Sequence, residues 1–235
     1  MKEIFKLTSA SSLLAALFFN IGSSTSAWAQ ESAEKPAGFI RFVNAVVEGD
    51  GPLEISINGE RTNQKGYKLG QRTRAFEVPT GTQEITIVRN GTESGKTRVK
   101  VEDKLTTTLI PFAERMPATD EKPAFWAIRI LRLKQITPKT EFAASFISVA
   151  NNPEIQVELG ETDGSWKPYS VKRMAVTSAP ISFTAGYVPL RLKGGDELPS
   201  IPISNAGNYV VLFYNDHEDK LQSISFQDAK LLSAD

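Results

Sequence analysis

Short segments in which apolar and polar residues alternate recur along this chain, and they constrain its fold more than any other feature. Leu53, Ile55 and Ile57 alternate with Glu54 and Ser56. The same period of two recurs around residues 84–87, 98–102, 154–159 and 188–193. That period places one face of a strand in a core and the other in solvent, and sheets of this kind are usually antiparallel. The pattern predicts an all-β fold.

Turn residues separate these segments. Asn58-Gly59 and Asn90-Gly91 favour hairpins, because both residue types accept positive φ. The mature part of the chain contains no convincing amphipathic helix of about ten residues or more. We expect Leu53, Ile55, Ile57, Ile85 and Ile87 to be buried, and Glu54, Ser56 and Glu84 to be exposed. Many short strands at this spacing are typical of a sandwich or a barrel.

A weak internal repeat divides the chain. Residues 39–45 followed by 53–57 resemble residues 145–151 followed by 154–159: each pair reads as a strand, an Asn-bearing corner and an alternating strand. We therefore predict two tandem antiparallel β-sandwich domains, at 38–136 and 140–230. They join near Gln135 to Lys139, where Pro138 ends a long apolar strand. Domains of about 100 residues can bury a core without disulfides, which a chain with no cysteine requires.

The first 29 residues read as a Sec-type signal peptide, followed by a polar leader at 30–37. Lys2 and Lys6 precede a short apolar run at 13–19, and Ala27-Trp28-Ala29 has the small-residue pattern of a cleavage site. No cysteine follows that run to carry a lipid anchor, and no later segment is apolar enough to span a bilayer. We expect cleavage after Ala29 and a periplasmic or extracellular protein.

Charge and composition exclude some functions. The 27 basic and 27 acidic side chains cancel, so the chain lacks the basic excess of a nucleic-acid-binding protein. The absence of cysteine removes thiolate nucleophiles and zinc-thiolate sites. No catalytic constellation is apparent, so we expect no cofactor and no catalytic residue.

The single histidine, His217, lies in the acidic segment Asn215 to Asp219. It is either part of a metal or acid–base site or an exposed residue at a hairpin tip, and the polar surroundings favour the tip. Whether the acidic turn at Asp216 to Asp219 binds a metal stays open. Residues 90–97 end in Gly-Lys-Thr but fall one residue short of a phosphate-binding loop. Alternating strands flank them, which favours a hairpin turn.

Trp166 and Tyr169 are the candidate binding residues. They lie in a polar segment, residues 162–169, that is rich in turn formers. Large amphipathic rings on such a segment are typical of binding hot spots. Two interpretations remain: the rings form a platform for a ligand, or they close one end of the sandwich.

Two families resemble parts of the chain. Residues 40–45 followed by 53–59, and 78–81 followed by 84–87, resemble the secreted bacterial family termed domain of unknown function 4397. That resemblance covers about residues 38–229 and implies an immunoglobulin-like sandwich, often in tandem. In the second half, Ser148 stands where the family's arginine, Arg41 in the first half, would be. The overall plan is also similar to the AlgF family of periplasmic accessory proteins in alginate O-acetylation.

Neither resemblance supplies active-site residues. Together they imply an exported binding or adaptor protein, accessory to cell-envelope polysaccharide modification such as O-acetylation. Its partner would be a protein or a polysaccharide of the envelope, with no nucleic acid involved. The alternatives are a structural module of a surface layer or matrix, and an envelope enzyme that uses serine or carboxylates.

Overall fold

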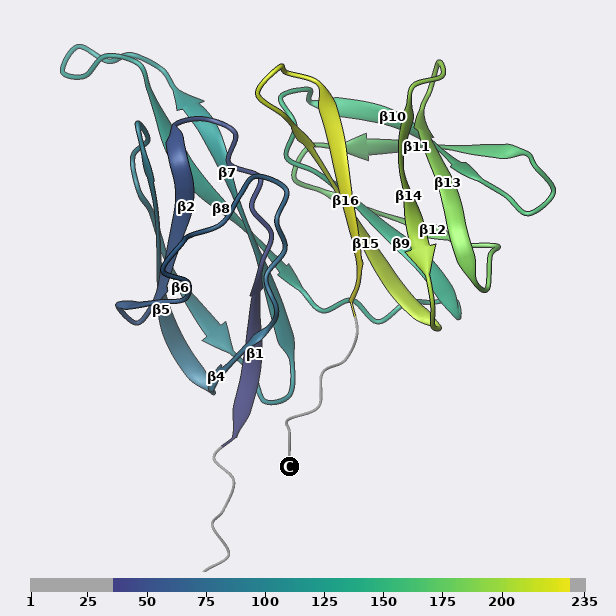
Figure 1. The fold of residues 1–235 in the computed structure, drawn as a ribbon, viewed down its shortest axis with the longest axis horizontal. Coiled ribbons are helices and arrows are strands. Elements are labelled where there is room, and N and C mark those ends of the chain that lie inside the picture. The colour runs from purple at the N-terminus through teal and green to yellow at the C-terminus, as the bar shows by residue number, and fades with distance from the viewer. Residues whose placement is uncertain (1–35, 229–235) are drawn as a thin grey trace, which may run out of the picture. The chain divides into compact units, whose positions relative to one another are not determined.

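The computed structural model describes residues 36–228, which form strands, turns and loops with no helix. The predicted signal peptide at 1–29 and most of the leader at 30–37 lie outside the described residues. Within the described range there is no helix of the length and hydropathy needed to cross a membrane. The sixteen strands form four sheets arranged as two β-sandwiches (Figure 1), so the predicted all-β, tandem-sandwich class is confirmed.

Eight strands make the first sandwich. They are β1 (Ala37–Phe42), β2 (Asp50–Ile57), β3 (Glu60–Arg61), β4 (Phe76–Pro79), β5 (Gly81–Asn90), β6 (Gly95–Val101), β7 (Thr106–Met116) and β8 (Phe125–Lys134). One sheet has the order β4-β1-β7-β8 and the other the order β3-β2-β5-β6.

The second sandwich also has eight strands. They are β9 (Phe142–Ser148), β10 (Glu154–Gly160), β11 (Trp166–Lys172), β12 (Val176–Pro180), β13 (Gly186–Leu192), β14 (Glu197–Ile203), β15 (Gly207–Asn215) and β16 (Leu221–Gln227). Its sheets have the orders β12-β9-β15-β16 and β11-β10-β13-β14. The predicted junction at 135–139 falls in the segment between β8 and β9.

The two sandwiches repeat one topology strand for strand. Adding eight to each strand number of the first sandwich gives both sheet orders of the second. The ladders are antiparallel with one exception in each sandwich: β1 runs parallel to β7, and β9 runs parallel to β15. The first strand of each repeat therefore enters its sheet beside a strand that comes much later in the chain.

The structure agrees with the register of the repeat, because Val43 and Val149, the fifth residues of 39–45 and 145–151, make equivalent backbone bonds to Leu109 and Phe213. It does not agree with the placement of Ser148 at the position of Arg41. Ile40 and Phe42 face the core of the first sandwich, so Arg41 faces away from it. Ser148 instead shares the face of Phe146 and pairs with Phe213, both of which lie in the second sandwich's core. Arg41 and Ser148 thus lie on opposite faces of their strands, which no correct alignment of equivalent positions allows.

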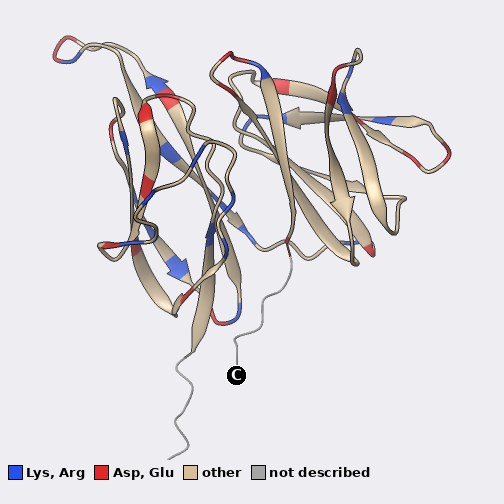
Figure 2. Ribbon diagram, viewed as in Figure 1, with Lys and Arg blue, Asp and Glu red and all other residues tan. Residues whose placement is uncertain are grey.

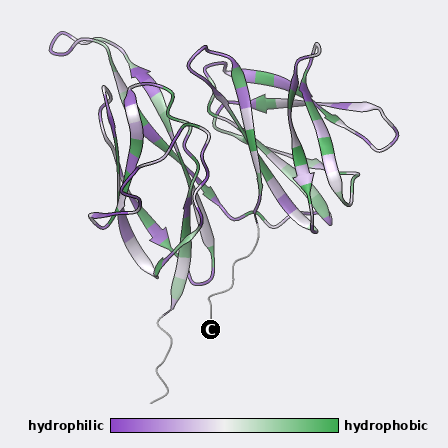
Figure 3. Cartoon of the chain, in the orientation of Figure 1, coloured by the Kyte–Doolittle hydropathy of each residue, from purple (hydrophilic) through white to green (hydrophobic). Residues whose placement is uncertain are grey.

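Alternation along the strands builds each core, as the hydropathy colouring shows (Figure 3). The five apolar residues expected to be buried, Leu53, Ile55, Ile57, Ile85 and Ile87, are buried. Glu84 is exposed as expected, whereas Glu54 and Ser56 are half-buried. The reason is local: both lie on β2 between β3 and β5, and Glu54 forms an ion pair with Arg61.

Four strands are buried on both faces: β1, β7, β9 and β15. One face of each lies in its own sandwich core. On the other face, β7, β9 and β15 contribute to a third apolar cluster shared by the two sandwiches, which Val43 and Ala45 join just after the end of β1. From the first sandwich this cluster takes Val43, Ala45, Ile110, Phe112 and Leu133, and from the second Ile147, Val149, Val210, Leu212 and Phe226. Figure 2 shows Lys and Arg as well as Asp and Glu scattered over both sandwiches.

A buried charge pair lies beside the third cluster. Arg41 Nη1 is 3.8 Å from Asp228 Oδ1, and both side chains are almost fully buried. The other carboxylate oxygen, Oδ2, accepts a hydrogen bond of 3.0 Å from the backbone N–H of Ile136 in the linker. The Arg41 guanidinium also lies over the Phe226 ring, 5.2 Å from its centroid. Desolvation raises the pKa of Asp228 above its usual value, although the Ile136 N–H and the Arg41 charge oppose this.

A raised pKa means that folding favours the protonated carboxyl, so Asp228 contributes stability that is fully present at low pH. This contribution is lost as pH rises through the folded pKa. We expect the unfolding free energy of the wild type, measured relative to Asp228→Asn, to fall as the pH rises above about 4, the usual pKa of an aspartate. Denaturant titrations of both proteins at several pH values measure this difference. A difference that grows with pH would contradict the assignment.

Candidate functional site

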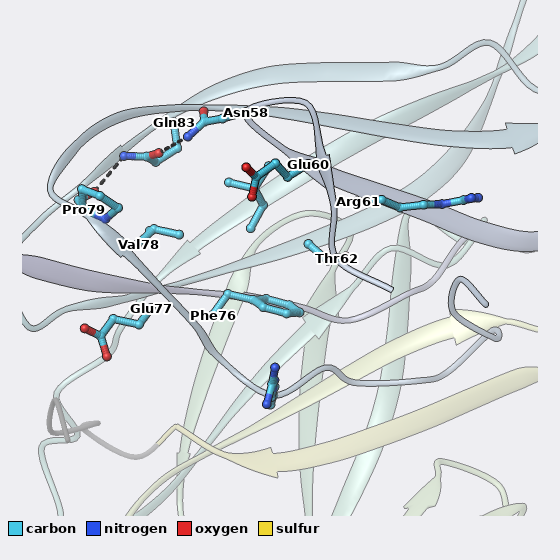
Figure 4. Close-up of a pocket in the computed structure, with 11 residues that line it drawn as sticks. Asn58, Glu60, Arg61, Thr62, Phe76, Glu77, Val78, Pro79 and Gln83 are labelled. Atoms are coloured by element: carbon cyan, nitrogen blue, oxygen red, sulfur yellow. Dashed lines mark hydrogen bonds between the residues drawn. The ribbon is translucent and has the colours of Figure 1, made fainter. Parts of the chain in front are cut away.

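A groove of the first sandwich lies between the edges of its two sheets, at β3 and β4. Both strands end their sheets, so each leaves one side without a neighbouring strand. The groove has a volume of about 430 Å³. Its apolar lining residues include Ile57, Phe76 and Val78, of which Figure 4 labels Phe76 and Val78. We call it the edge groove.

The backbone of β4 presents hydrogen-bonding groups to the edge groove. On β1, the backbone N–H of Phe39 points toward β7 and donates to the carbonyl of Leu105, whereas the backbone groups of Phe42 point to the opposite side and bond to Thr73. Backbone N–H and C=O groups point to alternate sides along a strand. Those of Gly38 and Ile40 therefore point toward β4 and bond to their partners Val78 and Phe76. The N–H and C=O of Glu77 therefore point away from β1, along the free edge.

The same alternation applies at β3. Asn58 and Gly59 both have positive φ, 51° and 84°, as the two central residues of a type I′ hairpin require. This confirms the predicted turn and pairs Ile57 with Glu60. Thr62 donates its N–H to Ile55. The backbone groups of Arg61, between these two pairs, face away from β2.

One end of the groove is closed by a chain of amide hydrogen bonds. Asn58 Nδ2 donates to Gln83 Oε1 at 2.6 Å, and Gln83 Nε2 donates to the carbonyl of Pro79 at 2.7 Å (Figure 4). Asn58 Oδ1 also accepts from the N–H of Glu84. These bonds hold the β2–β3 hairpin against the end of β4, so the two free edges keep a fixed separation at this end.

The rim of the groove carries charges of both signs. Arg61 forms an ion pair with Glu54 and Arg74 lies over the Phe76 ring, with Cζ 5.9 Å from the ring centroid. Glu60 and Glu77 supply the negative charges of the lining. The groove therefore favours no single sign of ligand charge, and its chemistry combines an apolar floor with amide and backbone hydrogen-bonding groups.

The second sandwich closes the equivalent position. There the counterpart of β3 is β11, which runs for seven residues rather than two. Its Ser170 carbonyl accepts a 3.0 Å hydrogen bond from the Thr177 hydroxyl on β12, the counterpart of β4. The two sheet edges thus touch in the second sandwich, and the short β3 is what leaves the groove open in the first.

Trp166 and Tyr169, the residues proposed from sequence, both lie on β11 and both are half-buried. They are three residues apart on one strand, so their side chains point to opposite faces. Tyr169 packs on the second core with its ring centroid 5.6 Å from that of Phe146. Trp166 lies on the outer face. The structure therefore does not bring the two rings together, and a binding role for either stays a prediction.

The outer face around Trp166 contains residues that sequence reasoning missed. The Arg191 guanidinium lies 4.0 Å from the centroid of the Trp166 ring, and Arg191 Nε donates to Glu158 at 2.6 Å. Tyr187 lies on β13, the strand that also carries Arg191, and is 73% exposed. Alternation along residues 188–192 places Arg191 on this face, and that signal was available in the sequence.

His217 is exposed in the turn between β15 and β16, which confirms the hairpin-tip interpretation. The neighbouring Asp216 carboxylate accepts a hydrogen bond from the Gln222 side chain, which lowers its pKa, with further bonds from the backbone of Lys220 and Glu218. Between residues 36 and 228, no three His, Asp or Glu side chains gather in a way that could hold a metal ion. Residues 90–97 form the hairpin between β5 and β6.

Truncating the two β11 rings separates their roles. Tyr169→Ala removes a ring packed on the core, and we expect it to lower the unfolding free energy by about 2–4 kcal/mol. Trp166→Ala should lower it by about 1 kcal/mol, because it removes an outer-face ring and its cation–π contact. Chemical denaturation of the two single variants measures the difference. Equal losses would mean that the Trp166 ring is also part of a core.

No family model matches the chain, and a search of curated proteins gave no significant match. The function is therefore argued from the geometry of the site.

Proposed function

We propose that this chain is an exported, non-catalytic binding protein that captures an extended segment of a protein partner in the edge groove. The observation that carries the proposal is the pairing of two free strand edges across one apolar floor. An extended peptide that adds to a sheet edge gains affinity from main-chain hydrogen bonds. It gains specificity from the pockets that receive alternate side chains.

The groove supplies both parts of that recognition. The outward N–H and C=O of Glu77 are placed to bond the backbone of an added strand. Ile57, Phe76 and Val78 offer the apolar floor on which every second side chain of the added strand would pack. The mixed charges of Arg61, Arg74, Glu60 and Glu77 suit a polypeptide, whose side chains carry both signs.

The role that the sequence resemblance implies is compatible with this chemistry. An adaptor accessory to envelope polysaccharide modification would hold another protein of that machinery, and the periplasmic or extracellular location follows from the predicted signal peptide. The closed edge of the second sandwich supports the assignment of this role to the first, because Thr177 and Ser170 already occupy the corresponding gap.

Replacing one backbone donor tests the proposal. Glu77→Pro removes an N–H that points away from β1, and proline is tolerated on an edge strand for that reason. Glu77→Ala removes the same side chain and keeps the N–H. In pull-downs from an envelope extract, we expect the wild type and Glu77→Ala to capture the partner equally. Glu77→Pro should capture at least about tenfold less, because it lacks an edge hydrogen bond and its ring obstructs the added strand.

Two results would contradict the proposal. Equal capture by all three proteins would place the partner surface away from the edge groove. Binding of purified envelope glycans that Trp166→Ala abolishes and Glu77→Pro leaves intact would assign recognition to the outer face of the second sandwich. Light scattering on the three proteins tests the structural-module alternative, which requires self-association without a partner. Circular dichroism confirms that Glu77→Pro keeps its sheet content.

A further inference from the structure

The other two sheet edges of the first sandwich, opposite the edge groove, belong to β6 and β8. They are joined at one end by Glu93, in the turn before β6. Glu93 donates its N–H to the carbonyl of Trp126 at 2.8 Å, and its carbonyl accepts from the N–H of Ile128 at 2.9 Å. Farther along, the Arg132 guanidinium on β8 donates to the hydroxyl of Thr97 on β6. The two edge strands therefore form one side of the sandwich.

This side is basic, and the fold does not require it to be. The strands β6 and β8 together carry no acidic side chain and six basic ones, namely Lys96, Arg98, Lys100, Arg129, Arg132 and Lys134. Their counterparts in the second sandwich, β14 and β16, carry no basic side chain and one acidic one, Glu197. Because the two sandwiches share one topology, the basic residues are particular to the first sandwich.

Most of these cations lack a carboxylate partner. Arg129 and Lys134 are the two that form ion pairs, with Glu114 and Glu102. The other four form no ion pair within residues 36–228, and all four are exposed. Their charges are therefore available to an anion from solution.

Three of the four make a regular row along β6. Val99 and Val101 lie in the core, so Lys96, Arg98 and Lys100, which alternate with them, point to the outer face of the sheet. Alternate residues on a strand lie about 6.6 Å apart, so the row spans roughly 13 Å. We call these three residues the basic row.

Hydroxyl groups lie beside the basic row on the neighbouring strand. In the β5–β6 ladder, Thr86 pairs with Lys96 and Thr82 pairs with Lys100. Both threonines alternate with buried residues of β5 and so share the outer face with the row. Glu84 lies between them on that face. This part of the face thus combines spaced cations with hydroxyl groups and one carboxylate that can accept hydrogen bonds.

We propose that the basic row binds a linear acidic polysaccharide. The carboxylates of the sugar chain would lie against the cations, and its hydroxyls would bond to Thr82, Thr86 and Glu84. Weak contacts repeated along a polymer add up, because binding of one sugar unit raises the effective concentration of the next. A nucleic acid fits less well, because neither β5 nor β6 carries an aromatic side chain on which bases could stack.

Charges on edge strands also deter pairing with the sheet of another molecule. The second sandwich meets that need on β14 with two prolines, Pro199 and Pro202, and without a cation. Protection of the edge therefore does not require a basic row, and the experiment below separates the two roles.

The test titrates the full chain with polygalacturonate in a calorimeter, with dextran as the neutral polymer. We expect saturable binding of polygalacturonate and none of dextran. Binding should weaken as ionic strength rises, because the Debye length falls from about 30 Å at 0.01 M to about 10 Å at 0.1 M. Polyglutamate, which has carboxylates but no hydroxyls, should bind about fivefold more weakly. Polyglutamate binding as tight as that of polygalacturonate, or no saturable binding of polygalacturonate, would overturn the proposal.

Charge variants locate the site. Replacing the three residues of the basic row with glutamine should weaken polygalacturonate binding about tenfold. The matched control replaces three exposed lysines of the second sandwich with glutamine and should bind as the wild type does, namely Lys167, Lys172 and Lys193. Wild-type affinity in the basic-row variant would refute the proposal and leave edge protection as the role, which light scattering would show as self-association of that variant.

Two further variants keep the result interpretable. Thr82→Val with Thr86→Val should weaken binding of polygalacturonate and leave that of polyglutamate unchanged, because only the sugar hydroxyls are affected. Glu77→Pro should bind polygalacturonate as the wild type does, so this proposal and the edge groove can fail separately. If circular dichroism shows that the triple variant loses its sheet content, Lys96→Gln with Lys100→Gln replaces it, with an expected loss of about fivefold.

Discussion

Burial of four strands on both faces is the constraint on which the rest of this structure depends. Strands β1, β7, β9 and β15 lie at the centre of their sheets and contribute to the cores of their sandwiches. The opposite faces of β7, β9 and β15 also contribute to the third cluster. A strand in that position has no polar face to present to solvent or to a ligand. Arg41 is a nearly fully buried charged side chain on β1, and Asp228 and the Phe226 ring accompany it. Recognition is consequently left to the outer strands.

The candidate site follows from that division. The edge groove exists because β3 stops after two residues, so the sheet edges of the first sandwich stay apart. The backbone groups of Glu77 that point into the open side are held in place, because the neighbouring residues Phe76 and Val78 pair with β1.

Period-two alternation was enough to predict the fold class and the buried faces of β2 and β5, and the Asn58-Gly59 pair was enough to predict the hairpin between β2 and β3. It was not enough for the sites. The pairing of β1 with β7 and the meeting of β3 with β4 are long-range events that local patterns do not encode. Residues 162–169 were expected to be a polar, turn-rich segment, but the turn ends before Trp166, and Trp166 and Tyr169 lie three apart on strand β11, which puts their rings on opposite faces. The repeat and its register were visible in the sequence, whereas the family resemblance placed Ser148 one residue away from the position equivalent to Arg41, and one residue of shift exchanges the two faces.

The parallel pairs impose an order on folding. Phe42 pairs with Leu109, and Ser148 pairs with Phe213, so the first strand of each sandwich meets its neighbour only after more than sixty further residues are in place. Loops of that length close slowly, and contacts so distant in sequence lower the folding rate. Because synthesis begins at the N-terminus, β1 has no central partner until β7 has been made. The mainly apolar residues 39–46 therefore stay unburied longest while the first sandwich is synthesised. They are the segment of that sandwich most prone to misassociation.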